Sequence, residues 1–332
     1  MIILSCITIF SLACLLTLFL RYYALQKSLL DIPNHRSSHT IPTPRGGGIA
    51  FVACFLLTLL ICFYNNIIPA NLIFAYFIGG FFIALLGFLD DRGHIPPLWR
   101  LIGHLLASGF ALYLIGGMPN LYFLKFLPSW FSNILGLLYL MWLLNLYNFM
   151  DGIDGIAAIE ALSVCLGISL IYALLHMPAH LILPLSLFCA VAGFLVWNFP
   201  PARIFMGDAG SSFLGFILGL MSLEAAKLDS RFFTAWLILL GIFIVDATYT
   251  LIRRALHKQK LYEGHRSHAY QKAALYCNSH LTVSTVVLVI NLFWLLPLAI
   301  LVSLGKVPDF IGLFLAYSSI LVLVIKFKAG TE

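Results

Sequence analysis

Eleven long apolar runs constrain this chain more than any other feature of its sequence. A helix needs about 20 apolar residues to cross roughly 30 Å of hydrocarbon, and each run is close to that length. A membrane barrel would instead show strands of about 10 residues with alternating polarity. The pattern therefore predicts about eleven membrane-spanning helices, at residues 2–20, 47–64, 67–89, 98–115, 130–149, 156–177, 181–199, 211–226, 232–252, 281–304 and 309–325.

The composition agrees with this prediction. Apolar residues make up 62% of the chain and charged residues only 10%, against roughly 25% charged residues in an ordinary soluble domain. A soluble globule could not bury that much apolar surface, which excludes a soluble enzyme, a disordered chain and a conventional nucleic-acid-binding protein. We expect an all-α polytopic protein of the lipid bilayer, a single integral-membrane domain over residues 1–332, with no nucleic acid as partner.

The basic residues predict the orientation in the membrane. Arg21 follows the first run and no basic residue precedes it, which is the reverse of a cleaved signal peptide, so residues 2–20 are interpreted as a retained span. With the N-terminus outside, the C-terminus is cytosolic and nearly all of the 19 Lys and Arg residues lie on or beside the cytosolic side, as the positive-inside rule requires. The basic residues expected outside are Lys125, Lys227, Arg231 and Lys306.

Acidic residues are scarce but collect on the predicted cytosolic side. A carboxylate deep in the membrane costs about 2.5–3.5 kcal/mol on insertion scales, so a gathering of them indicates a site. Carboxylates from several loops suit a hard cation such as Mg²⁺, with Mn²⁺ as the second candidate, and arginines in the same loops suit phosphates. The acids concerned are Asp31, Asp90, Asp91, Asp151, Asp154, Asp208, Asp246 and Glu263.

Three motifs in these breaks are candidates for chemistry. The adjacent Asp90 and Asp91 end one span, and because close carboxylates raise each other's pKa, they include a candidate proton acceptor. The segment NLYNFMDGIDG (145–155) repeats an amide or acid every third residue, which predicts one polar side of a helical turn. Asp208, among small residues before the eighth span, is the best metal-ligand candidate; interface charge, a polar helix end and a helix cap are the respective alternatives.

Two further segments carry basic residues. Arg45 precedes three glycines at the start of the second span, a pattern that can form an anion-binding nest but is also common in plain entry loops. The segment HRSH in the largest loop supplies His265, Arg266 and His268, which could grip a diphosphate. A zinc site that includes His257 is the less favoured reading of that loop.

The motifs PTPRGGG, GFLDD, NxxNxxDGxDG, IFMGDAGS and HRSH occur in an order that resembles the polyprenyl-phosphate N-acetylhexosamine-1-phosphate transferases, the MraY/WecA-like glycosyltransferase family 4. The likeness runs through every predicted cytosolic loop. The HRSHAYQ segment is most similar to the branch that initiates O-antigen chains, the WbpL-type enzymes. The resemblance implies an active site built from cytosolic loops in the bacterial inner membrane.

The resemblance also implies roles for individual residues. Asp90 matches a residue proposed to deprotonate or orient the lipid phosphate, and Asp151 one once proposed as a covalent nucleophile. Both are retained with Asp91 as catalytic candidates. The metal ligands implied are Asn148 and Asp208, and the substrate-binding residues are Arg45, Arg100, Asp154, Phe205, His265, Arg266 and His268.

The implied reaction transfers an N-acetylhexosamine-1-phosphate, which can be a deoxy sugar, from a UDP-sugar to undecaprenyl phosphate and releases UMP. It would be the first membrane step of O-antigen, lipopolysaccharide or related glycan synthesis. A WecA-like enzyme specific for UDP-N-acetylglucosamine is the alternative, and a membrane transporter is a remote one, since polar groups crowd one end of the spans. The sequence leaves open the sugar, the pathway and whether the protein forms a homodimer.

Overall fold

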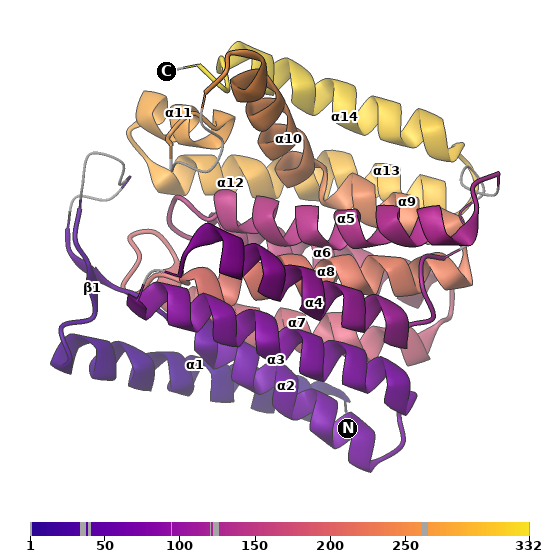
Figure 1. Ribbon diagram of the computed structural model, residues 1–332, viewed down its shortest axis with the longest axis horizontal. Helices are drawn as coiled ribbons and strands as arrows, with labels where there is room; N and C mark the ends of the chain where they lie inside the picture. Colours follow the sequence, from indigo (N-terminus) through magenta and orange to yellow (C-terminus); the bar gives the residue numbers. More distant parts are fainter. Residues whose placement is uncertain are drawn as a thin grey trace.

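The computed structural model describes residues 2–33, 38, 41–93, 95–119, 121, 126–259 and 265–331. Long helices run side by side, and the chain ends at the opposite end of the bundle from its start (Figure 1). The elements are α1 (Ile2–Gln26), β1 (Leu30–Asp31), β2 (Thr43–Pro44), α2 (Gly48–Tyr64), α3 (Ala70–Gly93), α4 (Pro97–Leu114), α5 (Ser129–Phe149), α6 (Ile156–Leu174), η2 (Pro178–Leu181), α7 (Ile182–Asn198), α8 (Asp208–Leu228), α9 (Ser230–Leu239), α10 (Gly241–Leu256), α11 (Ala269–Cys277), α12 (His280–Ile290), η3 (Asn291–Leu295), α13 (Leu296–Ser303) and α14 (Asp309–Lys326).

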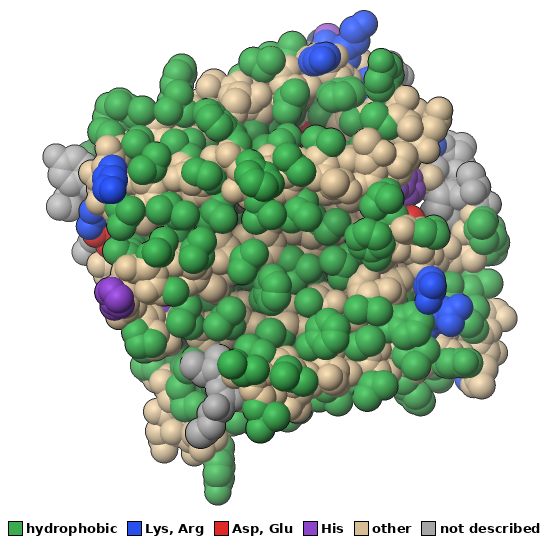
Figure 2. Space-filling model, turned by 180° about the vertical axis from the view of Figure 1, so that it is seen from behind, with side chains coloured by type: hydrophobic (Ala, Val, Ile, Leu, Met, Phe, Trp, Pro, Cys, Tyr) green, Lys and Arg blue, Asp and Glu red, His purple; other side chains and the backbone are tan. Residues whose placement is uncertain are grey.

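The predicted apolar runs form helices, although fewer than eleven of these helices meet the requirements for a membrane span. Within the described residues, eight helices are long and apolar enough to cross a bilayer, and the bent pair α9–α10 passes the same test as one unit. Helices α2 and α4 coincide with the two other predicted runs but are not among these candidates. Large apolar side chains such as Leu57, Phe82 and Val286 lie on the outside, and Figure 2 shows apolar side chains spread over one face of the bundle. Because water would oppose such a surface, the chain is an all-α, multi-pass membrane protein.

The ninth predicted span differs from the expectation of one straight helix over residues 232–252. It consists of α9 and α10, which meet at an angle of 70°. The bend falls at Gly241, where an added Cβ would lie 3.0 Å from the Ile320 side chain of α14. Glycine has a low helix propensity and permits this close approach, so the break and the packing of α14 have a common cause.

Helix α8 forms the centre of the bundle. Every residue from 209 to 223 is buried, and α2, α3, α5 and α9 pack around it. Phenylalanines fill the gap between α2, α7 and α8, with the rings of Phe51 and Phe194 centred 5.5 Å apart and those of Phe55 and Phe213 5.9 Å apart. The first residue of this buried helix is Asp208, so the best metal-ligand candidate is attached to the most rigid element of the fold.

The breaks expected on the cytosolic side all lie at one end of the bundle. In Figure 1 the chain between α1 and α2, with the two-residue strands β1 and β2, lies at the same end as the starts of α4, α8 and α11. Strand pairing is antiparallel, with Leu30 opposite Pro44 and Asp31 opposite Thr43. Lys227, Arg231 and Lys306 lie at the other end, whereas Lys125 is outside the described residues. The two ends of the bundle are therefore chemically distinct; which end faces the cytosol stays a prediction.

Candidate active site

The carboxylate of Asp91 closes the start of α8. Its Oδ1 accepts a hydrogen bond from the backbone N–H of Asp208 at 3.0 Å, and its Oδ2 accepts one from Ala209 at 3.4 Å. The first N–H groups of a helix have no partner within the helix and carry partial positive charge, so an anion stabilises them. This arrangement needs a close approach of α3 to α8, and an added Cβ at Gly87 would lie 2.5 Å from the Ala209 nitrogen. Asp91 thus acts as a cap supplied by another helix.

Two arginines hold the carboxylates at this end of α3 and α8. Arg45 Nη2 lies 2.9 Å from Asp91 Oδ1 and 2.7 Å from Asp208 Oδ1. Arg100 pairs with Asp90 and lies 3.7 Å from Asp208 Oδ2. Burial alone would lower the pKa of Arg45, but the neighbouring carboxylates outweigh it, so the pKa lies above its ordinary value. We call these five residues the ion-pair cluster; it joins three breaks of the chain.

Two of the three glycines after Arg45 serve packing rather than anion binding. The N–H groups of Gly47 and Gly48 donate to the carbonyl oxygens of Phe205 and Met206, both at 2.9 Å. An added Cβ on Gly48 would lie 2.6 Å from the Cα of Gly210 in α8. Because two of the N–H groups are already used, the predicted anion nest is wrong for those two positions. The glycines instead let α2 begin directly against the start of α8.

The segment after α5 differs from its prediction in one respect. The helix ends at Phe149, so the amides and acids of 145–155 do not lie along one side of a helical turn. Asn145 donates back to Met141 O within α5, whereas Asn148 donates to Ser211 Oγ on α8 at 2.9 Å. Sequence spacing alone gave no stop signal at residue 149, and Gly155, with φ of 75°, ends the loop in the left-handed region.

The loop after α5 is held by side chains that the sequence analysis did not single out. Asn198 Oδ1 accepts from Gly155 N at 3.1 Å, and its Nδ2 donates to Ile204 O at 2.9 Å. Tyr270 OH donates to Phe149 O at 2.9 Å. These bonds join the loops before α6 and α8 to α11, so residues far apart in sequence share one rigid wall.

A cavity of about 340 Å³ opens among these elements. Burial, followed by the nearby Asp208, raises the pKa of Asp151 in its wall well above the ordinary value, while Arg45 acts in the opposite direction. A concave site with strongly perturbed carboxylates is typical of catalysis. Of the predicted site residues, its lining includes Arg45, Asn148, Asp151, Asp154, Phe205 and Asp208. It also includes Asp31, one of the acids expected at the site, and three residues that were not predicted, Asn198, Gln271 and His280.

A neighbouring cavity of about 460 Å³ adjoins the first and shares Ser38, Asp154, Gln271 and His280 with it. Of the HRSH segment, only Arg266 lines this second cavity. Asp90 and Arg100 line neither of these two cavities; Arg100 pairs with Asp90 and also contacts Asp208, which lines the first one. Glu263 lies outside the described residues.

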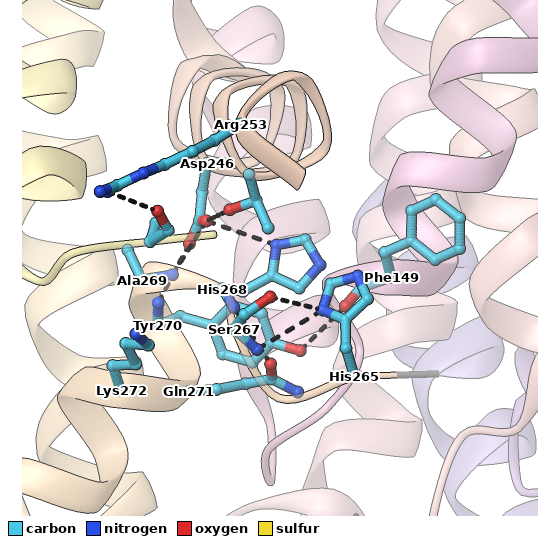
Figure 3. A network of polar contacts seen from close by, with 12 residues as sticks. Phe149, Asp246, Arg253, His265, Ser267, His268, Ala269, Tyr270, Gln271 and Lys272 are labelled. Carbon is cyan, nitrogen blue, oxygen red and sulfur yellow. Dashed lines mark hydrogen bonds and ion pairs between the residues drawn. The ribbon is translucent and has the colours of Figure 1, made fainter. Parts of the chain in front are cut away.

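The histidines of HRSH form part of a buried framework (Figure 3). Asp246 of α10 accepts hydrogen bonds from the backbone N–H groups of Ala269 and Tyr270, each at 3.0 Å, at the start of α11. His268 is 2% exposed and its Nδ1 lies 3.4 Å from Asp246 Oδ1. The rings of His265 and His268 stack with centres 4.9 Å apart. Neither imidazole is among the residues lining the two cavities, so their substrate-binding role stays a prediction.

The first cavity offers a metal ion oxygen ligands from more than one loop. Among the residues that the structure describes, no three His, Cys, Asp or Glu side chains lie close enough to hold a metal by themselves. Mg²⁺ does not need such a cage, because it usually keeps several waters and binds one or two carboxylates together with substrate phosphates. Asn148, Asp151 and Asp208 contribute only oxygen ligands to the cavity wall. These residues fit Mg²⁺ bound together with a phosphate ligand.

Comparisons with known proteins point in one direction. Residues 73–226 match the model of glycosyl transferase family 4. A probable undecaprenyl-phosphate N-acetylglucosaminyl 1-phosphate transferase of Bacillus subtilis is 29% identical over 80% of this chain and 75% of its own length. An undecaprenyl-phosphate alpha-N-acetylglucosaminyl 1-phosphate transferase of Thermotoga maritima is 26% identical over 77% of this chain and 78% of its own.

A third relative extends the range of these enzymes. The phospho-N-acetylmuramoyl-pentapeptide-transferase of Borreliella burgdorferi is 29% identical over 69% of this chain and 72% of its own length. The matched family region runs from α3 to α8 and so contains Asp90, Asp91, Asn148, Asp151 and Asp208. Together with the helical membrane fold and the motifs at one end of the bundle, these matches support the assignment of the chain to the MraY/WecA-like transferases of glycosyl transferase family 4.

Proposed function

We propose that the protein transfers an N-acetylhexosamine-1-phosphate from a UDP-sugar to undecaprenyl phosphate and releases UMP. The observation that carries this proposal is the cavity at one end of a membrane bundle, where carboxylates and Arg45 meet. Such a place lets a soluble nucleotide meet an acceptor whose isoprenoid tail stays in the bilayer. The names of the B. subtilis and T. maritima relatives describe this class of reaction.

Two anionic reactants must approach each other, so charge stabilisation and positioning are the main tasks. An oxygen of the lipid phosphate attacks the β-phosphorus of the UDP-sugar in line. The bond from the β-phosphorus to the oxygen that bridges to the α-phosphate breaks, and that oxygen leaves with UMP. The lipid phosphate is itself the nucleophile, so no enzyme-linked intermediate is needed. Arg45 and Arg100 are already positioned beside Asp208, where they offset charge that accumulates on the phosphates.

A bound Mg²⁺ would be held by Asn148 and Asp208 and would reduce the negative charge of the diphosphate. Asp91 keeps Arg45 and the start of α8 in place through three contacts. Asp90 pairs with Arg100 and is assigned to orient or deprotonate the lipid phosphate. Asp154 and Phe205, both in the cavity wall, are assigned to the uridine.

The proposed setting is the bacterial inner membrane, with the cavity on the cytosolic face where UDP-sugars are available. The transfer would begin an O-antigen, lipopolysaccharide or related glycan chain. UDP-N-acetylglucosamine is the second candidate donor, which the names of the B. subtilis and T. maritima relatives favour. The transporter alternative gains no support, because the buried polar pair Glu160 and Asn291 lines neither cavity described above.

The proposal is tested with the purified full-length protein in detergent. UMP release is measured with undecaprenyl phosphate and a panel of UDP-N-acetylhexosamines, with and without each substrate. We expect UMP release only when both substrates are present, its loss on chelation, and its return on addition of Mg²⁺ or Mn²⁺. Absence of release with every donor in the panel, by protein that remains folded, would contradict the proposed function.

A further inference from the structure

His280 occupies a junction in the site. It is the first residue of α12, and it lines both cavities and a third, smaller one of about 180 Å³. Ser38 and Asp154 share this position in all three linings. The tenth predicted span begins at residue 281, so the sequence assigned no role to His280. Because His280 lines all three cavities, it can affect how a ligand extends from one cavity into the next.

Within the described residues, the polar contacts of His280 are with Asp154. The backbone N–H of Asp154 donates to the imidazole Nδ1 at 3.4 Å, and Nδ1 also lies 3.3 Å from Asp154 Oδ2. One ring nitrogen cannot both accept from the amide and donate to the carboxylate, and the amide hydrogen is directed at Nδ1. Nδ1 is therefore the acceptor, and the imidazole holds the backbone at Asp154.

The carboxylate of Asp154 has a donor of its own. The backbone N–H of Ala202 donates to Asp154 Oδ2 at 3.1 Å. Ser284, one turn further along α12 and on the same face as His280, donates through its hydroxyl to the Asp154 carbonyl oxygen at 2.9 Å. Two residues of α12 therefore hold the backbone N–H and the backbone carbonyl of Asp154, whose side chain lines the first cavity.

We infer that His280 is a positioning residue that holds the backbone at Asp154 so that the Asp154 carboxylate faces the nucleoside of the donor. This inference rests on the proposed function. A carboxylate oxygen accepts hydrogen bonds, and the uridine end of a UDP-sugar offers ring N–H and hydroxyl donors, whereas its diphosphate offers none. His280 should therefore act on nucleoside binding and leave the diphosphate subsite of Arg45 and Asp208 unchanged.

Three variants test whether the effect of residue 280 depends on the position of its hydrogen-bonding atom or only on the polarity of its side chain. In His280→Asn the side-chain amide oxygen takes the place of Nδ1 as the acceptor, whereas in His280→Gln the longer side chain places that oxygen near Nε2 instead. His280→Ala removes the acceptor altogether. The readouts are kcat and KM for the UDP-sugar, the Kd of UMP, inhibition by inorganic pyrophosphate, and the thermal unfolding midpoint of each variant in detergent.

For His280→Ala we expect KM and the Kd of UMP to rise roughly tenfold, the effect of losing one hydrogen bond that holds Asp154 in place. The value of kcat should stay within about twofold. His280→Asn should restore UMP binding to within about threefold of the wild-type protein, and His280→Gln should resemble His280→Ala. Inhibition by pyrophosphate should be equal in all four proteins, because the diphosphate subsite does not depend on this contact.

Other results overturn the inference. An unchanged UMP Kd in His280→Ala, or equal values for the Asn and Gln variants, would show that Nδ1 does not position Asp154. A parallel loss of pyrophosphate inhibition would indicate a general disturbance of the site. If the Ala variant unfolds, the Asn and Gln pair carries the test. Failure of the proposed function is distinct, because the wild-type protein would then release no UMP from any UDP-sugar.

Discussion

Two aspartates of this protein perform the same structural task in different surroundings. Asp91 on α3 accepts from the first N–H groups of α8, and Asp246 on α10 accepts from the first N–H groups of α11. Both side chains are almost completely buried, with 7% and 3% of their surface exposed. In each case a carboxylate from one helix closes the N-terminus of another.

The difference lies in the partner of each carboxylate. Asp91 contacts Arg45, which is 38% exposed and lines the first cavity, and Arg45 also contacts Asp208. Asp246 contacts Thr250 and His268, both buried. The Asp91 cap is therefore connected through Arg45 to the cavity, whereas the contacts of the Asp246 cap are with buried residues. Burial of an acid does not distinguish a catalytic from a structural role; the exposure of its partner does.

The largest effect is expected at the end of this chain of contacts. Asp208→Ala removes the carboxylate that faces Arg45 and Arg100 in the cavity, and we expect UMP release to fall roughly 10³-fold. The substitution leaves the Asp91 cap in place because the capped group is the backbone N–H of residue 208. Membrane insertion and the elution profile in detergent should resemble those of the wild-type protein.

The matched control for that variant is Asp229→Asn at the other end of the bundle. Asp229 accepts from Arg231 N at 2.8 Å at the start of α9, and asparagine caps a helix about as well as aspartate. This variant should keep nearly full activity. Near-normal turnover in Asp208→Ala would remove Asp208 from the list of metal and phosphate contacts.

An intermediate effect should separate the two caps themselves. Asp91→Asn and Asp246→Asn each weaken hydrogen bonds to a buried charged group, which should lower the free energy of unfolding by about 2–3 kcal/mol. Only Asp91→Asn also releases Arg45, so its folded fraction should lose at least about tenfold in kcat, while folded Asp246→Asn stays closer to the wild-type value. Thermal unfolding and UMP release are measured on the same samples. Equal activity losses would erase the distinction drawn above.

The smallest effect concerns the pH dependence of stability at the Asp246 framework. Burial, together with His268 and Arg254, lowers the pKa of His265 to about 3, and Asp246 opposes this shift. The unfolded chain then binds a proton below the ordinary pKa of 6.5 that the folded chain does not, so stability falls as the pH decreases from about 7 to 5. His265→Gln should reduce this fall in the unfolding midpoint without changing its value at pH 8. An identical pH dependence in the variant would mean that His265 is protonated in the fold.

The spans were predictable because a single physical rule governs them. A backbone in hydrocarbon must satisfy its hydrogen bonds within the helix, and only long apolar runs allow this. The bend at Gly241 and the short helix α11 were not predictable. The first depends on the approach of α14 to that glycine, and the second is stabilised by Asp246, 23 residues before its first residue.

The sequence predicted which types of residue form the candidate site, and it predicted some of the individual residues. Asp151, Asp154 and Asp208 line one cavity as expected, since acids are rare in this chain and cluster at one end. His280 and Asn198 carried no such signal, because an isolated histidine or asparagine beside an apolar run is equally consistent with a helix end. Residues that line the cavity and residues that support its wall can be of the same type, so only their contacts in the structure distinguish them.

The sequence by itself determined that the chain crosses a membrane many times, that its acids and arginines collect at one end, and that the motifs follow the order of one enzyme family. These properties depend on local hydrophobicity and spacing, which are written along the chain. Only the tertiary structure decided that Asp91 caps α8, that His268 is buried beside Asp246, and that His280 holds Asp154. The direction in which a side chain points depends on helices distant in sequence, and close packing fixes that direction only after they assemble.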